Sequence, residues 1–138
     1  MGKTSGRTGK RALPRPTHAE LALLRGLWAR GPQTVREVLE SLESEREVGY
    51  TTVLKQLQIM LDKGLVRRRE DGRSHVYEAA IPREATERGL VGDLVRHVFG
   101  GSSARLVLSA LAEEPASLAE IAQIRALLDG IEGKGGKR

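Results

Sequence analysis

The 138-residue sequence contains no cysteine, only one Trp, two Tyr and one Phe, and no long apolar run. The lack of cysteine excludes disulfides, thiolate metal sites and a cysteine nucleophile. So few aromatic residues leave no platform on which the bases of a single-stranded nucleic acid could stack. Because the apolar runs are short, we expect no membrane insertion and no secretory signal, and therefore a cytoplasmic protein.

Patterns typical of catalysis are also missing. The three histidines, His18, His75 and His97, are far apart in the sequence and lack the spacing of metal ligands. There is no G-x-S-x-G motif, and no isolated pair of carboxylates lies in an apolar setting. We therefore expect no metal site, no cofactor and no enzymatic activity.

The net charge of +5 is concentrated at the N-terminus. Residues 1–16 contain no acidic residue, and five basic ones, namely Lys3, Arg7, Lys10, Arg11 and Arg15. Gly, Ser, Thr and Pro fill most of this segment, which predicts a disordered basic arm over residues 1–16. Such an arm favours a nucleic acid as the partner. A tail that only increases solubility is the alternative.

Helix signals follow the arm at regular intervals. Thr17-His18-Ala19-Glu20 is a capping box that begins a first helix, and Gly31-Pro32 ends it. Thr34-Val35-Arg36-Glu37 is a second capping box, which opens a short second helix. A third helix is predicted over residues 50–63, with Gly49 as its N-cap and Gly64 after its last turn.

The third helix has a polar side that is suited to reading DNA. Val53, Leu57 and Met60 recur at helical spacing and are expected to face the core. The opposite side is small and polar, which favours hydrogen bonds to base edges in the major groove. The polar residues on this side are Thr51, Thr52, Lys55, Gln56 and Gln58. An ordinary solvated helix face is the alternative.

A basic β-hairpin is predicted after the third helix. Residues 65–70 and 73–78 are strand-like, and Asp71-Gly72 between them is a strong hairpin signal. Three helices followed by a hairpin predict a winged helix-turn-helix domain over residues 17–82. Positive charge gathers on the hairpin and its entry, at Lys63, Arg67, Arg68, Arg69 and Arg73. The candidate DNA contacts on the hairpin are Arg67, Arg69, Arg73 and His75.

Residues 83–133 predict three further helices, over about 84–99, over 103–113, and from a third capping box at Ser117. These helices carry more apolar residues than three short helices can bury, so we expect a homodimer. The alternative is that they pack onto the winged helix within a monomer. The candidate interface comprises Leu94, Val98, Leu108, Leu111, Ile121, Ile124 and Leu128. Residues 134–138 are predicted to form a loose tail.

Three segments in this order resemble the penicillinase-repressor (BlaI/MecI/CopY) family of bacterial regulators. They are THAELALLRGLWARG from Thr17, YTTVLKQLQIMLDKGLV from Tyr50, and RREDGRSHVY from Arg68. The resemblance covers residues 17–79 and extends more weakly to about residue 132. It implies a mainly α fold with a small β-hairpin, in which a winged helix reads a palindromic operator and a C-terminal helical domain dimerises. By the same resemblance, the family's recognition-helix contacts fall on Thr51, Thr52, Lys55 and Gln56, and its wing contacts fall on Arg73 and its neighbours.

The sequence departs from the family pattern in two places. The copper-responsive branch uses C-terminal cysteine pairs, and their absence here excludes thiolate copper sensing. In the antibiotic-responsive branch, a membrane sensor protease leads to cleavage of an Asn-Phe bond in the dimerisation domain. The aligned pair here is Ser109-Ala110, so we expect this chain to remain uncut.

These observations predict a homodimeric transcriptional repressor that binds double-stranded operator DNA. A membrane sensor protease is a candidate partner through the resemblance alone. Two alternatives stay open. One is a winged-helix regulator of another type, released by a small molecule bound between the wing and the dimerisation helices. The other is a winged helix that serves only as a protein-interaction module.

Overall fold

The computed structural model describes residues 13–43 and 48–135. The chain forms two compact units that divide after Val91, within helix α4 (Arg83–His97). The predicted boundary at residue 82 lies earlier. It differs because the first turns of α4 pack with the first unit: Thr86 is fully buried, and the guanidinium of Arg15 lies against Gly89.

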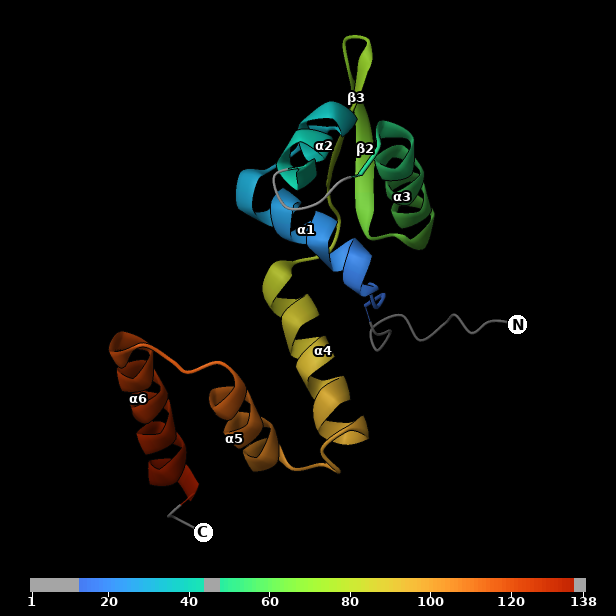
Figure 1. The fold of residues 1–138 in the computed structure, drawn as a ribbon. Coiled ribbons are helices and arrows are strands. Elements are labelled where there is room, and N and C mark those ends of the chain that lie inside the picture. Colours follow the sequence, from blue (N-terminus) through green and yellow to red (C-terminus); the bar gives the residue numbers. More distant parts are fainter. Residues whose placement is uncertain (1–12, 44–47, 136–138) are drawn as a thin grey trace, which may run out of the picture. The chain divides into compact units, whose positions relative to one another are not determined.

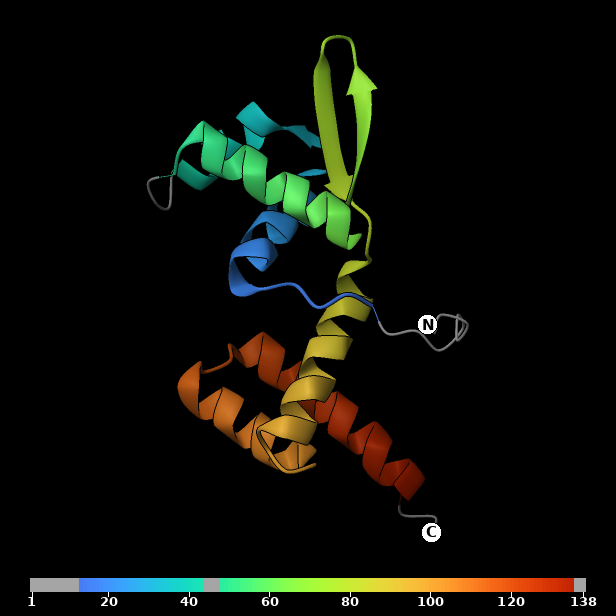
Figure 2. The same ribbon diagram turned by 90° about the vertical axis from the view of Figure 1, so that its right-hand side faces the viewer.

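The first unit is a winged helix-turn-helix, as predicted (Figure 1). Its helices are α1 (His18–Arg30), α2 (Val35–Glu43) and α3 (Tyr50–Lys63). Its strands are β1 (Gln33–Thr34), β2 (Val66–Asp71) and β3 (Ser74–Ala79), which form an antiparallel sheet in the order β1-β3-β2. Strand β1 was not predicted, because two residues carry no recognisable alternation. The hairpin of β2 and β3 is the wing, and Figure 2 shows it projecting beyond the three helices.

All three predicted capping boxes are confirmed. The backbone N–H of Thr17 donates to Glu20 Oε1 at 2.9 Å, and Glu20 N–H donates to Thr17 Oγ1 at 3.2 Å. Equivalent reciprocal bonds join Thr34 to Glu37 and Ser117 to Glu120. Each box satisfies two backbone N–H donors within four residues, so the start of each helix is determined locally.

The wing turn lies one residue later than predicted. Strand β2 ends at Asp71 and β3 begins at Ser74, and these two residues pair across the hairpin. The two loop residues are therefore Gly72 and Arg73, instead of Asp71 and Gly72. Gly72 has a φ of 67°, as the first loop residue of a type II′ turn requires. This turn places Arg73 at the tip of the wing.

The core lies between the three helices and the sheet of the first unit. Fourteen buried apolar residues form one cluster, from Leu23 on α1 to Ile81 after β3. Trp28 packs against this cluster and donates its indole N–H to the carbonyl oxygen of Ile81 at 3.0 Å. This packing holds the wing and α3 on one common core.

The predicted disordered arm is too long at its C-terminal end. Leu13 packs against the core and Pro16 is buried, so residues 13–16 belong to the folded unit. The reason is that the apolar Leu13 and Pro16 can bury surface there, which a purely polar arm could not. Residues 1–12, which carry the other four basic residues of the arm, lie outside the described part of the chain.

The second unit consists of the end of α4, α5 (Ser103–Glu113) and α6 (Leu118–Gly135). Gly100 and Gly101, with φ of 59° and 88°, form the turn between α4 and α5. Helix α6 continues two residues past the predicted end of the helical domain at 133, and residues 136–138 lie outside the described part. None of residues 92–134 is buried. Within the described residues, no helix is both long and apolar enough to cross a membrane.

Candidate nucleic-acid interface

Helix α3 presents most of its predicted contacts to solvent. It begins after Gly49 and ends at Gly64, whose left-handed backbone (φ 82°) lets its N–H bond to carbonyls of the last turn. The helix buries Val53, Leu57 and Met60, as predicted. Burial of that side leaves three predicted contacts exposed on the other, namely Thr51, Thr52 and Lys55.

Gln56 is placed differently from the prediction. Its side chain is half-buried, and Nε2 lies 3.4 Å from Glu20 Oε2 at the start of α1. The amide therefore faces another helix of the same unit instead of open solvent. Sequence periodicity could not show this, because the carboxylate that attracts Gln56 is 36 residues away.

Glu20 is a buried carboxylate that sequence reasoning recognised only as part of a capping box. Its side chain is 2% exposed, and Lys63 Nζ donates to Oε1 at 2.8 Å and to Oε2 at 2.9 Å. Burial alone would raise the pKa of this carboxyl. The bonds from Lys63 and from the Thr17 N–H outweigh burial and lower the pKa below its usual 4.5.

Lys63 consequently has a different role from the one predicted. The sequence groups Lys63 with the cations at the entry of the wing, which would attract phosphate. Its ammonium instead neutralises Glu20, so its charge is not free to add to the positive surface. The bridge links the last turn of α3 to the first turn of α1 and so fixes the position of α3 relative to α1.

The register of the wing divides its basic residues between two faces. Residues that lie directly opposite each other on the two strands point to the same face of the hairpin. On one face, Arg68 is opposite Tyr77 and Glu70 is opposite His75. Arg67 pairs with Glu78 and Arg69 with Val76 on the other. The four predicted contacts, Arg67, Arg69, Arg73 and His75, are all exposed, but they do not form a single patch.

Two of the four predicted wing contacts have acidic neighbours. Arg67 Nε donates to Glu78 Oε2 at 3.2 Å, which partly offsets its charge. His75 Nε2 lies 3.8 Å from a carboxylate oxygen of Glu70. The other two, Arg69 and Arg73, make no ion pair with any described residue. These two therefore contribute the clearest positive charge among the predicted contacts.

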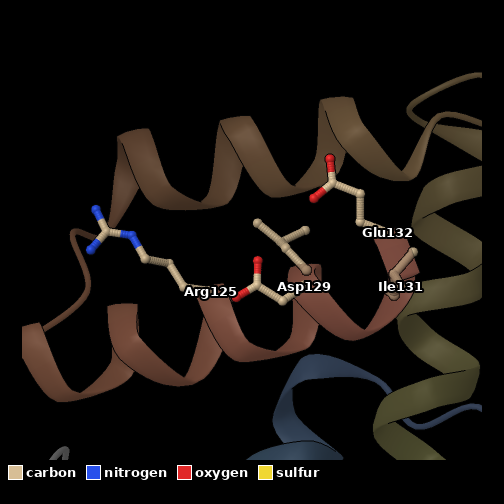
Figure 3. Close-up of a pocket in the computed structure, with 5 residues that line it drawn as sticks. Arg125, Asp129, Ile131 and Glu132 are labelled. Carbon is tan, nitrogen blue, oxygen red and sulfur yellow. The ribbon is translucent and has the colours of Figure 1, made fainter. Parts of the chain in front are cut away.

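The second unit exposes much of its apolar surface. Of the predicted interface residues, Ile121 and Ile124 are half-buried, and five are exposed by 37% to 69%: Leu94, Val98, Leu108, Leu111 and Leu128. A shallow groove of about 550 Å³ is lined by five residues of α6 (Figure 3). Leu128 and Ile131 are its apolar lining residues, and Arg125, Asp129 and Glu132 add charges of both signs.

The fold and the polar, positively charged side of the first unit define the class of protein, a winged-helix DNA-binding regulator. A family model described as penicillinase repressor matches residues 16–130. The transcriptional regulator BlaI of Mycobacterium tuberculosis (strain CDC 1551 / Oshkosh) is 34% identical over 119 residues, which are 86% of each chain. The chain belongs to the penicillinase repressor family and is a DNA-binding transcriptional repressor, not an enzyme.

Solved structures are similar to this chain in fold. The complex structure of hsRosR-SG has a TM-score of 0.50 at 16% identity, and covers 89% of this chain and 97% of that chain. The solution structure of the DNA binding domain of the repressor BlaI has a TM-score of 0.48 at 23% identity. It covers 54% of this chain and 92% of that domain.

Proposed function

We propose that this repressor binds a two-fold symmetric operator as a homodimer in the bacterial cytoplasm. The observation that carries the proposal is the contrast between the two units. The first buries a continuous core and presents a polar helix beside a basic wing. The second has no buried residue between 92 and 134 and exposes apolar side chains on all three of its helix segments.

A second copy of the chain is the natural cover for this apolar surface. Exposed leucine and valine side chains in such number are uncommon on a monomer and mark an interaction surface. A two-fold dimer matches each surface with its own copy, so one sequence supplies both sides. The proposed interface is formed by Leu94, Val98, Leu108, Leu111, Ile121, Ile124 and Leu128.

The DNA contacts follow from exposure and charge. We assign base or phosphate contacts on α3 to Thr51, Thr52 and Lys55, which are exposed. On the wing, Arg69 and Arg73 contact phosphates, because exposed cations position a protein on the duplex without reading its sequence. The exposed His75 can donate an imidazole N–H to a phosphate beside them. Arg67 is bonded to Glu78, and Gln56 is bonded to Glu20. We therefore assign these two residues to holding the wing and α3 in position.

Release from DNA by a membrane sensor protease of the β-lactam type is not expected. Ser109 and Ala110 replace the Asn-Phe pair and lie exposed on α5. Mass measurement after co-expression with such a protease tests this directly. An intact chain is the expected result, and a fragment ending at Ser109 would contradict it.

The experiment that tests the whole proposal is selection of bound sequences from random duplexes, followed by footprinting and sedimentation of the complex. We expect a palindrome whose half-sites lie one or more helical turns apart, about 10 base pairs each. Two chains should be bound per site. Recovery of a single, non-repeated half-site with one chain bound would refute the dimeric mode.

A further inference from the structure

A groove of about 400 Å³ runs between α3 and the wing, with the junction of β1 and α2 at its end. On α3 it is lined by Tyr50, Leu54 and Gln58, which recur every four residues and so form one stripe of the helix. The wing contributes Arg68, Arg73 and His75 among others, and α2 contributes Arg36. The groove therefore lies next to the DNA-reading face of α3.

The lining of this groove is positively charged and contains no carboxylate. Three arginines and a histidine line it, together with neutral residues only. Elsewhere in the described chain, Arg67, Arg83 and Arg96 each have a carboxylate oxygen within 3.2 Å. Arg36, Arg68 and Arg73 form no such pair with any described residue. Three arginines that line one groove and pair with no described carboxylate favour an anionic ligand, although Glu70 lies 3.8 Å from His75 at the edge of this lining.

Two further features suit the groove to such a ligand. The guanidinium carbon of Arg36 lies 5.3 Å from the centre of the Tyr50 ring, a cation–π contact that restrains the arginine beside the groove. Tyr77 also lines the groove, and its buried hydroxyl has no hydrogen-bond partner among the described residues. A buried hydroxyl without a partner is costly, so an acceptor oxygen on a ligand would satisfy it.

The register of the wing explains which arginines take part. Arg68 is directly opposite Tyr77, and both line the groove, whereas Arg67 and Arg69 point to the other face of the hairpin. The charge run Arg67-Arg68-Arg69 therefore supplies one cation to the groove and two to the opposite face. A shift of one residue in the pairing would reverse this division.

We propose that this groove is a phosphate-binding site in which Arg36, Arg68 and Arg73 hold the phosphate oxygens and the Tyr77 hydroxyl donates a further bond. The expected source is a phosphate of the DNA backbone beside α3, and this part of the inference rests on the proposed function. A free phosphate-bearing molecule presents the same chemistry. The test distinguishes the two sources.

The first arm of the test measures the salt dependence of binding to a duplex of mixed sequence. Each phosphate contact contributes about 0.9 to the slope of log affinity against log salt. Arg36→Ala and Arg68→Ala should each lower the slope by part of this amount, and the double variant by up to the whole of it, because the three arginines share one phosphate. Arg25→Ala is the matched control, because it removes an exposed arginine from α1, which does not line the groove. Tyr77→Phe should weaken binding several-fold without changing the slope.

The second arm titrates the DNA-free protein with inorganic phosphate against chloride at constant ionic strength, while amide NMR shifts are recorded. Weak binding that shifts the wing amides and is lost in Arg36→Ala supports the site. If phosphate binds in this way while the DNA slopes of Arg36→Ala and Arg68→Ala equal that of Arg25→Ala, the backbone source is wrong and a free phosphate is the ligand.

The remaining outcomes are also decisive. Unchanged slopes together with no phosphate binding would overturn the site altogether. If the wild-type protein fails to bind any duplex, the proposed function fails, and the phosphate titration alone then decides whether the groove is an anion site. Circular dichroism tests whether each variant is folded. We expect the fold to be retained, because the arginines are exposed and Tyr77→Phe removes only a hydroxyl.

Discussion

The ammonium of Lys63 lies 2.8 Å from the carboxylate of Glu20, and this pair joins the end of the recognition helix α3 to the start of α1. Glu20 is almost completely buried, whereas the Lys63 side chain is 37% exposed. The same carboxylate accepts a bond from the Thr17 N–H and lies near the Gln56 amide. One buried charge therefore connects the helix cap, the recognition helix and the entry of the chain into the domain.

Loss of this bridge should destabilise the first unit. Lys63→Met leaves Glu20 buried without its counter-charge, which in a fully buried pair costs about 3–5 kcal/mol. Because water screens the partly exposed Lys63, we expect a loss of roughly 1–3 kcal/mol in urea unfolding. Lys55→Met is the control, since it removes an exposed lysine from the same helix. Equal effects of the two substitutions would mean that the bridge does not stabilise the fold.

Acid should weaken the domain through the same carboxyl. The folded-state pKa of Glu20 lies below its usual 4.5, so the stabilisation is complete above that pH and is lost as the pH falls through the folded value. Urea unfolding between pH 7 and pH 3 should show a steeper loss for the wild type than for Glu20→Gln. Parallel curves for the two proteins would contradict this assignment.

Thr52→Ala should reduce operator binding more than random-DNA binding. Thr52 is exposed on the polar side of α3, and loss of one specific base contact costs about 1–3 kcal/mol. Fluorescence anisotropy with the selected operator and with a scrambled duplex measures both affinities. Asp62→Ala, an exposed change at the other end of α3, is the control. An equal loss on both duplexes would show that Thr52 contacts phosphate instead.

Deletion of residues 1–12 should weaken binding to operator and random DNA alike. The deletion removes Lys3, Arg7, Lys10 and Arg11, but keeps Leu13 and Pro16, which pack on the folded unit. Each lost phosphate contact lowers the salt slope by about 0.9. The slope of log affinity against log salt is the measurement. A slope equal to that of the full chain would make the arm a solubilising tail.

A charge at Leu128 should separate the dimer and leave the winged helix folded. Leu128 is 54% exposed and lines the groove of α6, so Leu128→Glu places a carboxylate in the proposed interface. Two linked half-site contacts bind about 10²–10⁴ times more tightly than one, and this gain should be lost. Leu127→Glu is the matched control, because Leu127 is similarly exposed but does not line the groove.

Sedimentation and operator affinity are measured together for these two variants. A dimeric Leu128→Glu protein with wild-type affinity would place the interface elsewhere. A monomeric protein that nevertheless binds the full operator as tightly as the wild type would show that dimerisation and DNA affinity are not coupled.

The sequence by itself determined the helices that carry the DNA-reading surface. Thr17 with Glu20 and Thr34 with Glu37 interact within one turn, so the start of each helix depends on four neighbouring residues. Gly64 ends α3 where predicted because a left-handed backbone is a local property of glycine. The apolar spacing likewise identified the buried side of α3.

Only the tertiary structure decided what the exposed side chains face. Lys63 and Gln56 turn toward Glu20, more than 30 residues away in sequence, because a buried carboxylate needs donors and these two helices meet there. In the wing, a turn one residue later than predicted fixes the pairing of β2 with β3. Side chains alternate between the two faces of a strand, so that register alone directs Arg68 into the groove and Arg69 away from it.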